Sequence, residues 1–141
     1  MAASIREQIV AYMASALGTV AGAGVYRSRQ SAVDRLDGPA ILVQPKDERV
    51  ENRHTGIAIR DLTVEIVLIY RSDTPDSSAD ATIQSMASAL TRDQTLGGLA
   101  DRIIEDGTEW RYEEADLTAM EVSLIYRVRY MTPTQVLSNI A

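Results

Sequence analysis

The spacing of apolar residues in the first part of the chain predicts a helix followed by short extended segments. From residue 4 to residue 17, apolar side chains recur at helical spacing, and Ser4 with Glu7 matches a capping box. Val25–Arg27 follows a glycine-rich break and is expected to be extended. Ala40–Val43, after a turn, has the pattern of a buried strand.

Alternation of apolar and polar residues predicts longer strands on either side of a second helix. Residues 57–71 are rich in β-branched side chains, and one face is apolar: Leu62, Val64, Ile66, Leu68 and Tyr70. Helical spacing returns at residues 78–91. The last third predicts strands at 99–104, 108–113 and 119–131, with a hairpin turn at Asp106 and Gly107 between the first two.

The final strand has two chemically different faces. One face is apolar and consists of Val122, Leu124, Tyr126, Val128 and Tyr130. The other face carries arginines at 127 and 129. If this strand pairs antiparallel with residues 57–71, Arg127 or Arg129 should lie near Glu65 or Asp61.

These elements predict an α+β fold, with two main helices packed on one face of a mainly antiparallel sheet and a long hairpin arm. A chain of 141 residues is long enough for one domain with its own core, so we expect a single domain over residues 1–141. The segment 133–141 is expected to be a loosely held tail.

The arm is the segment QPKDERVENRHTG, Gln44–Gly56, between two well-predicted strands. A connection of this length is uncommon in a compact domain and is often functional. We expect an extended hairpin that reaches a neighbouring subunit, the alternative being a solvated loop without a partner. The candidate interface residues are Lys46, Asp47, Glu48, Arg49, Glu51, Arg53 and His54.

The charge balance disfavours nucleic-acid binding. Twenty acidic residues against fourteen basic ones give a net charge of −6, which opposes phosphate neutralisation. Lys46 is the only lysine, and an arginine bias suits bidentate pairing in a protein interface, although a GC-rich genome would produce the same bias. The longest apolar run is Ile66–Tyr70, so neither a secretory leader nor a membrane span is expected.

Residues for catalysis are scarce. His54 is the only histidine and lies in a polar turn, so we interpret it as a solvated loop residue. The chain has no cysteine, no GxSxG motif and no histidine pair, and we expect no enzyme activity, no metal and no cofactor. Trp110 and Tyr112 are two residues apart and would share one face of a strand, which favours a core or interface anchor over a ligand platform.

The order of these segments resembles the tail terminator family of bacteriophages, the proteins similar to minor tail protein U. The resemblance lies in five features: VYRSR at Val25–Arg29, the strand that leads into DER at Ala40–Arg49, the second helix that runs to LGGLA at residues 78–100, Trp110, and the closing YRVRYMTP at Tyr126–Pro133. It implies a virion tail protein assembled in the host bacterial cytoplasm, as a homohexameric ring.

In that family the ring caps the tail tube, stops its polymerisation and provides the docking surface for the head. The resemblance therefore implies three kinds of partner: other copies of the chain, the phage tail tube protein and a head-completion or neck protein. DNA would pass through the ring without specific binding, and neither membrane nor cofactor would be involved.

Two other functions remain open at this point. A phage neck or head-completion subunit has a similar size and also forms rings, but it would bind on the portal side instead of to tail tubes. A small-molecule-binding regulatory α+β domain would show a ligand-dependent shift in melting temperature. An enzyme is the third and least supported possibility.

Overall fold

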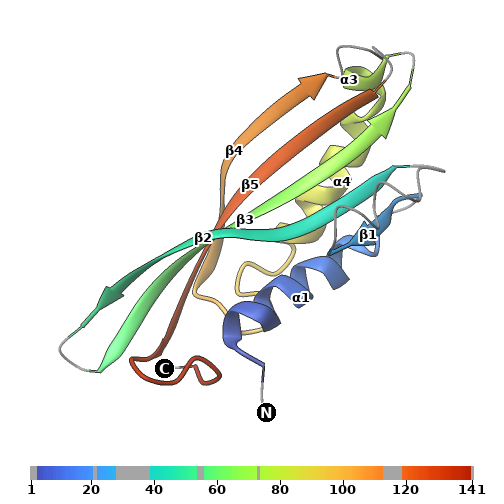
Figure 1. Cartoon of the computed structure of the whole chain (residues 1–141). Coiled ribbons are helices and arrows are strands. Elements are labelled where there is room, and N and C mark those ends of the chain that lie inside the picture. The colour runs from blue at the N-terminus through green and yellow to red at the C-terminus, as the bar shows by residue number, and fades with distance from the viewer. Residues whose placement is uncertain are drawn as a thin grey trace.

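A twisted five-stranded sheet with helices on one face forms the frame of the protein (Figure 1). The computed structural model describes residues 3–20, 22–27, 39–53, 56–72, 74–112 and 119–140. The elements in chain order are α1 (Ile5–Leu17), β1 (Gly24–Tyr26), β2 (Ala40–Asn52), β3 (Ile57–Arg71), α3 (Pro75–Ser78), α4 (Asp80–Thr91), β4 (Arg102–Tyr112) and β5 (Ala119–Pro133). The strand order is β1-β2-β3-β5-β4, and only the β1–β2 pair is parallel. The fold is therefore α+β, as predicted.

Helix α1 begins and ends where the sequence indicates. The side chain of Ser4 accepts a hydrogen bond from the backbone N–H of Glu7 at 3.2 Å, which satisfies one of the free donors at the helix start. Gly18 is the C-cap. The face that the helix buries consists of Ile5, Ile9, Val10, Met13 and Leu17.

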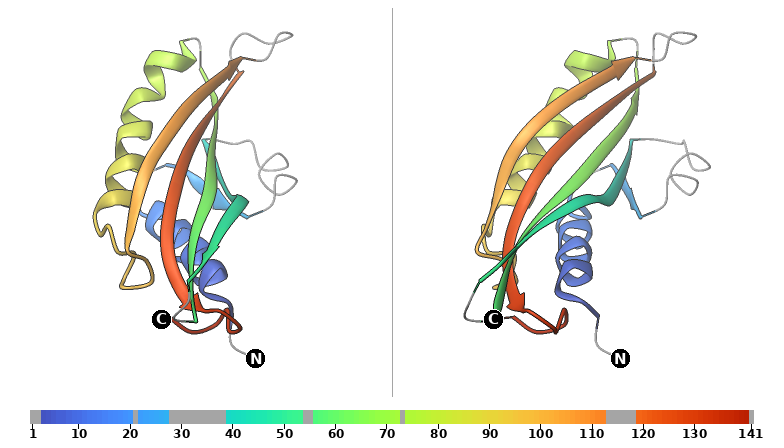
Figure 2. Two further views of the ribbon diagram at one scale, coloured as in Figure 1. Left: turned by 90° about the vertical axis from the view of Figure 1, so that its left-hand side faces the viewer. Right: turned by 60° about the vertical axis from the view of Figure 1, so that its left-hand side comes forward.

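The core lies between the helices and one face of the sheet. In β3 and β5, alternate side chains point toward α1 and α4, because successive residues of a strand face opposite ways. The buried set includes every residue predicted for the apolar face of the final strand, from Val122 to Tyr130. Both helices lie on this side of the bent sheet (Figure 2). A smaller cluster on the opposite face consists of Ala40, Leu42, Val67 and Ile69, with Tyr26 packed against it.

Strand β3 pairs with β5, which is the condition on which the predicted proximity of Arg127 or Arg129 to Glu65 or Asp61 depended. The strands are antiparallel over their whole length, with Ile57 opposite Pro133 and Arg71 opposite Ala119. Asp61 is directly opposite Arg129 in this register. Long antiparallel pairing at the centre of the sheet holds together residues that are far apart in sequence, such as Asp61 and Arg129, which are 68 residues apart.

The expected hairpin turn at Asp106 and Gly107 is wrong. Strand β4 runs through both residues, and each half pairs with β5: Glu105 lies opposite Tyr126, and Gly107 lies opposite Ile125. Asp106 is the extra residue of a β-bulge. An Asp-Gly hairpin turn needs positive φ, which Gly107 does not adopt, and the fifteen-residue β5 offers a partner to both halves of β4.

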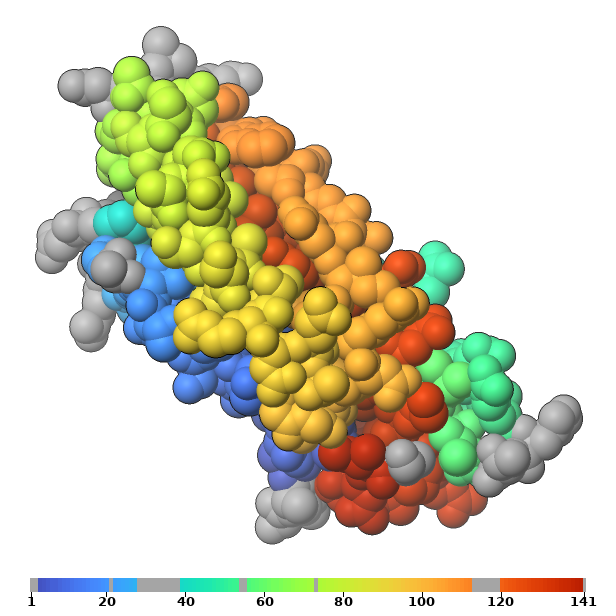
Figure 3. Space-filling view, turned by 180° about the vertical axis from the view of Figure 1, so that it is seen from behind, coloured from blue at the N-terminus to red at the C-terminus, as the bar shows by residue number. Residues whose placement is uncertain are grey.

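Strand β2 is much longer than the Ala40–Val43 predicted for it. It continues to Asn52 and pairs with β3 as far as Ala58, so the segment after residue 43 is one side of a β-hairpin. Lys46 forms a bulge directly after Pro45, a residue that cannot donate to a strand ladder. We call residues 44–56 the arm. It projects past the helices at one end of the molecule (Figure 3).

The second helix and the LGGLA segment match the predicted positions closely. A single turn, α3, precedes α4, which spans Asp80–Thr91 against the predicted 78–91. Leu96, Gly97 and Gly98 all have positive φ, which explains the glycine pair. The Asp93 carboxylate accepts backbone hydrogen bonds from Thr95 and Gly97, both at 3.0 Å. The hydrogen bond from the Thr95 hydroxyl has the largest effect in lowering the pKa of Asp93, and the two backbone hydrogen bonds lower it further.

The C-terminal segment is tethered at two points. The backbone N–H of Ile5 donates to the carbonyl of Leu137 at 2.8 Å, and that of Thr134 donates to Gly56 at 2.8 Å. Val136, Leu137 and Ile140 are exposed. These bonds connect the segment to the start of α1 and to the arm. That residues 133–141 are loosely held stays a prediction, which hydrogen exchange of their backbone amides would test.

Candidate assembly surfaces

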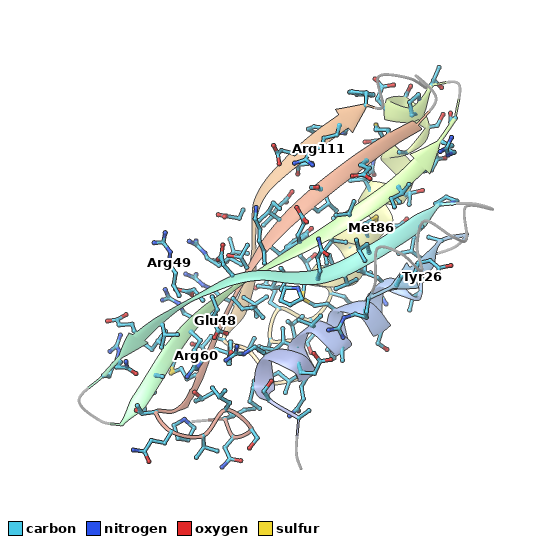
Figure 4. The ribbon with its side chains drawn as sticks, viewed as in Figure 1. Tyr26, Glu48, Arg49, Arg60, Met86 and Arg111 are labelled. Atoms are coloured by element: carbon cyan, nitrogen blue, oxygen red, sulfur yellow. The ribbon has the colours of Figure 1, made fainter. Side chains whose placement is uncertain are left out.

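The predicted interface residues of the arm do not all face the same way. The bulge at Lys46 changes which residues of β2 point toward the helices, so Glu48 faces inward and Arg49 faces outward (Figure 4). Lys46, Asp47, Arg49, Glu51 and Arg53 are exposed. His54, the last predicted residue, lies outside the described residues. Five of the candidates are therefore available to a partner on the exterior of the arm.

Glu48 is held inside the subunit at the base of the arm. One carboxylate oxygen lies 3.1 Å from Nη1 of Arg60 and 3.4 Å from Nη2 of Arg6, while the other accepts a hydrogen bond from the Tyr130 hydroxyl. The side chains of Glu48 and Arg60 are each 10% exposed. This cluster joins β2, β3, β5 and α1, so it fixes the direction in which the arm leaves the body.

Two of the partners of Glu48, Arg60 and Tyr130, have well-placed hydrogen bonds, whereas the buried Nε of Arg6 has no hydrogen-bond partner among the described residues. Arg60 Nε donates to the hydroxyl of Thr132 at 3.0 Å, and Thr132 is completely buried. Burial, followed by the hydrogen bond to Glu48, raises the pKa of the Tyr130 hydroxyl, which therefore stays protonated as the donor. Tyr126 differs, because its buried hydroxyl has no hydrogen-bond partner among the described residues. Burial, with a smaller contribution from Glu105, raises the pKa of Tyr126 to about 12.

One position in the sequence points to this cluster. Arg60 occupies an inward position on β3, two residues before Leu62, where an arginine is rarely buried without a partner. An inward arginine at the start of an apolar face predicts a nearby carboxylate. The bulge at Lys46, which the sequence did not indicate, brings Glu48 to that position.

The outward face of the sheet carries a charged row at the root of the arm. Arg49, Asp61, Arg129 and Arg102 lie opposite one another on β2, β3, β5 and β4. Arg129 donates two hydrogen bonds to Asp61, at 2.8 and 3.0 Å, which confirms the predicted proximity of these residues. The row itself has one carboxylate for three guanidinium groups, while the carboxylates of Glu51 and Asp101 next to it also act on Arg129.

The Asp61–Arg129 pair should make a small, pH-dependent contribution to stability. The guanidinium of Arg129 lowers the pKa of Asp61 below its ordinary value of 3.8. A lowered folded-state pKa means that the stabilisation is present above the unfolded pKa and is lost as pH falls through the folded one. Asp61→Asn should therefore lower the thermal midpoint at neutral pH, by a small amount because the pair is exposed to solvent.

The check is the difference in thermal midpoint between parent and Asp61→Asn, measured from neutral pH downward. We expect the difference to shrink toward zero as Asp61 of the parent becomes protonated. Glu109→Gln removes an exposed carboxylate from the same sheet face and should have little effect at any pH. A difference for Asp61→Asn that stays constant through this range would contradict the assignment.

A second surface lies at the other end of the sheet. Trp110 and Tyr112 share one face of β4, as predicted, and each side chain is about half exposed, at 52% and 51%. They line a shallow hollow with Asp76, Ser77 and Asp80 of α3 and α4. The sequence predicted either a core anchor or an interface anchor for these two residues. Their exposure favours the interface role.

Neither metal ligands nor membrane spans are found in the described part of the chain. No group of three or more histidine, cysteine, aspartate or glutamate side chains is arranged to hold a metal ion there. None of the described helices is long and apolar enough to cross a bilayer. The surfaces that stand out are the arm, the charged row and the aromatic hollow.

Comparisons with known proteins give one clear family. The family model described as phage minor tail protein U matches residues 1–130. Among solved structures, a chain from the virion of a native gene transfer agent particle aligns with 92% of this chain and 92% of its own length, at 18% sequence identity and a TM-score of 0.47. A comparison with curated protein sequences finds no match. The family match thus includes every described helix and most of β5.

Proposed function

This chain belongs to the phage minor tail protein U family, and we propose that it is a tail terminator subunit, which forms a ring on the finished tail tube. It is a structural tail protein of a phage or prophage. In the proposed role the ring stops polymerisation of the tube protein and offers its other face to the head. The observation that carries the proposal is the family match over residues 1–130.

The shape of the subunit supports ring formation. The arm and the β4 end of the sheet lie at opposite ends of the molecule (Figure 1). A contact between two different surfaces of identical copies is heterologous, and such contacts close into a ring when the rotation between neighbours permits. A subunit with a projecting arm at one end and an exposed aromatic surface at the other is suited to this kind of assembly.

Charge supports the passage of DNA through the ring. A basic bore would bind phosphates and slow the DNA, whereas a subunit with a net charge of −6 can present an acidic or neutral wall. The arginines of the charged row would then belong to subunit contacts or to the end faces of the ring. We expect the isolated protein not to bind duplex DNA at physiological salt. Salt-resistant binding in a gel-shift assay would favour a DNA-gripping neck protein instead.

The location of the protein in the virion separates a terminator from a neck subunit. Purified, labelled protein is mixed with tail tubes and, separately, with portal-containing heads, and its position is recorded by electron microscopy. A terminator should bind one end of the tube in the absence of heads. Binding to portals but not to tubes would contradict the proposal and favour the neck alternative.

Shortening the arm should abolish assembly without unfolding the body. Replacing residues 46–54 by a tight Asn-Gly turn removes the exposed candidates and also Glu48, so Arg60→Met is added to avoid a buried, unpaired guanidinium. Mass spectrometry of rings and binding to tube ends are the readouts. Glu48→Met combined with Arg60→Met in the full-length chain is the control for folding, because it removes the same two charges and keeps the arm. Unchanged assembly of the shortened variant would reject the arm as an interface.

A further inference from the structure

The hollow beside Trp110 and Tyr112 combines exposed aromatic rings with negative charge. Both rings belong to β4, and Asp76 and Asp80 line the same hollow from α3 and α4. None of the residues that line it is basic. On this side of the molecule α4 lies beside β4 (Figure 3). Aromatic faces rimmed by carboxylates attract guanidinium groups, which can stack on the rings and pair with the acids.

The arm carries the complementary charge. Glu48 is occupied inside the subunit by Arg6 and Arg60, so it does not contribute a free negative charge to the arm. The exposed charged side chains of the described arm are three cations and two anions, namely Lys46, Arg49 and Arg53 against Asp47 and Glu51. Arg49 points away from the body (Figure 4). The free surface of the arm is therefore positive by one charge.

The arm of a subunit cannot reach its own hollow. The arm lies at one end of the long sheet, and the hollow lies at the end where β4 meets α3 (Figure 1). Only a second molecule can bring the two surfaces together. Because one surface is basic and the other acidic, the partner with the required chemistry is another copy of this chain.

We propose that the arm of one copy docks in the Trp110–Tyr112 hollow of the next copy, with Arg49 and Arg53 against the aromatic rings and the two aspartates. This inference rests on the proposed ring. The contact joins two different surfaces, so each subunit uses its arm on one neighbour and its hollow on the other, and the pattern repeats until the ring closes.

Charge reversal provides a selective test of the docking. Variant A carries Arg49→Glu and Arg53→Glu, which makes the arm acidic, and variant B carries Asp76→Arg and Asp80→Arg, which makes the hollow basic. Each variant alone should fail to assemble, because its arm and hollow then have the same sign. In a mixture, the acidic arm of A fits the basic hollow of B, and the basic arm of B fits the acidic hollow of A.

We expect the equimolar mixture to form rings that contain equal numbers of both variants. Native mass spectrometry measures the composition of the rings, both free in solution and bound to tube ends. Recovery also shows that both variants fold. The matched controls Arg92→Glu and Glu109→Arg reverse exposed charges outside both surfaces and should assemble like the parent. Trp110→Ser combined with Tyr112→Ser should prevent assembly at concentrations where the parent forms rings.

Several results would overturn the inference and leave the proposed function intact. One is a parent that forms rings while the mixture of A and B does not. Another is a Trp110→Ser, Tyr112→Ser variant that forms normal rings but no longer binds tubes, because the hollow would then face the tube protein. A parent that neither assembles nor binds tube ends would overturn the proposed function itself, and the docking with it.

Discussion

Replacing Glu48 by alanine should lower the free energy of unfolding by about 3–5 kcal/mol, because it leaves the buried guanidinium of Arg60 without its counter-charge. The Tyr130 hydroxyl loses its acceptor in the same variant. Asp47→Ala, one residue away and exposed, is the matched control and should change stability by less than about 0.5 kcal/mol. Urea-induced unfolding at neutral pH measures both.

A double replacement separates the loss of the ion pair from the loss of packing. Glu48→Met combined with Arg60→Met removes both charges and keeps apolar volume, so most of the stability lost in Glu48→Ala should return. Arg6 loses its ion-pair partner in this variant, but its side chain is 39% exposed, so water can solvate the guanidinium group. A Glu48→Ala variant as stable as the parent would contradict the assignment of Glu48 as the residue that fixes the arm.

Replacing Leu124 by alanine should cost about 2–5 kcal/mol of unfolding free energy. Leu124 is 2% exposed and lies in the middle of β5, between Ile66 of β3 and Thr108 of β4. The loss combines the transfer of the removed methyl groups with the cavity left in the core. Ile125→Ala, on the half-buried outer face of the same strand, should cost less. A Leu124→Ala loss below about 1 kcal/mol, or a larger loss for Ile125→Ala, would contradict the face assignment.

The strands at the centre of the sheet could be predicted well because apolar side chains recur at every second residue along one face of each. In β3 and β5 a shift of one residue would turn an entire apolar face to water, so the pattern specifies which face is buried and excludes a one-residue slip of the pairing. That is why the sequence could predict that Arg127 or Arg129 would lie near Glu65 or Asp61, and the structure brings Arg129 and Asp61 together. The capping box at Ser4 likewise identified the start of α1, because the bond it describes is local.

The edge strands were harder to predict because each contains a bulge. Asp106 in β4 and Lys46 in β2 interrupt the alternation, and an Asp-Gly pair resembles a turn when its tertiary partner is unknown. The bulge at Lys46 also hid the inward position of Glu48. Exposed contact surfaces such as the Trp110–Tyr112 hollow have no periodic signal, because they bring together residues from β4, α3 and α4.

The central claim is that this protein ends tail-tube growth as a ring, and the length of tail tubes tests it most directly. A tail tube protein from the same phage or prophage is polymerised with and without the purified protein, and tube lengths are measured by electron microscopy over time. We predict that tubes stop elongating when the protein is added, with a ring at one end of each. Tubes that continue to elongate at the same rate, with no protein at their ends, would contradict the account.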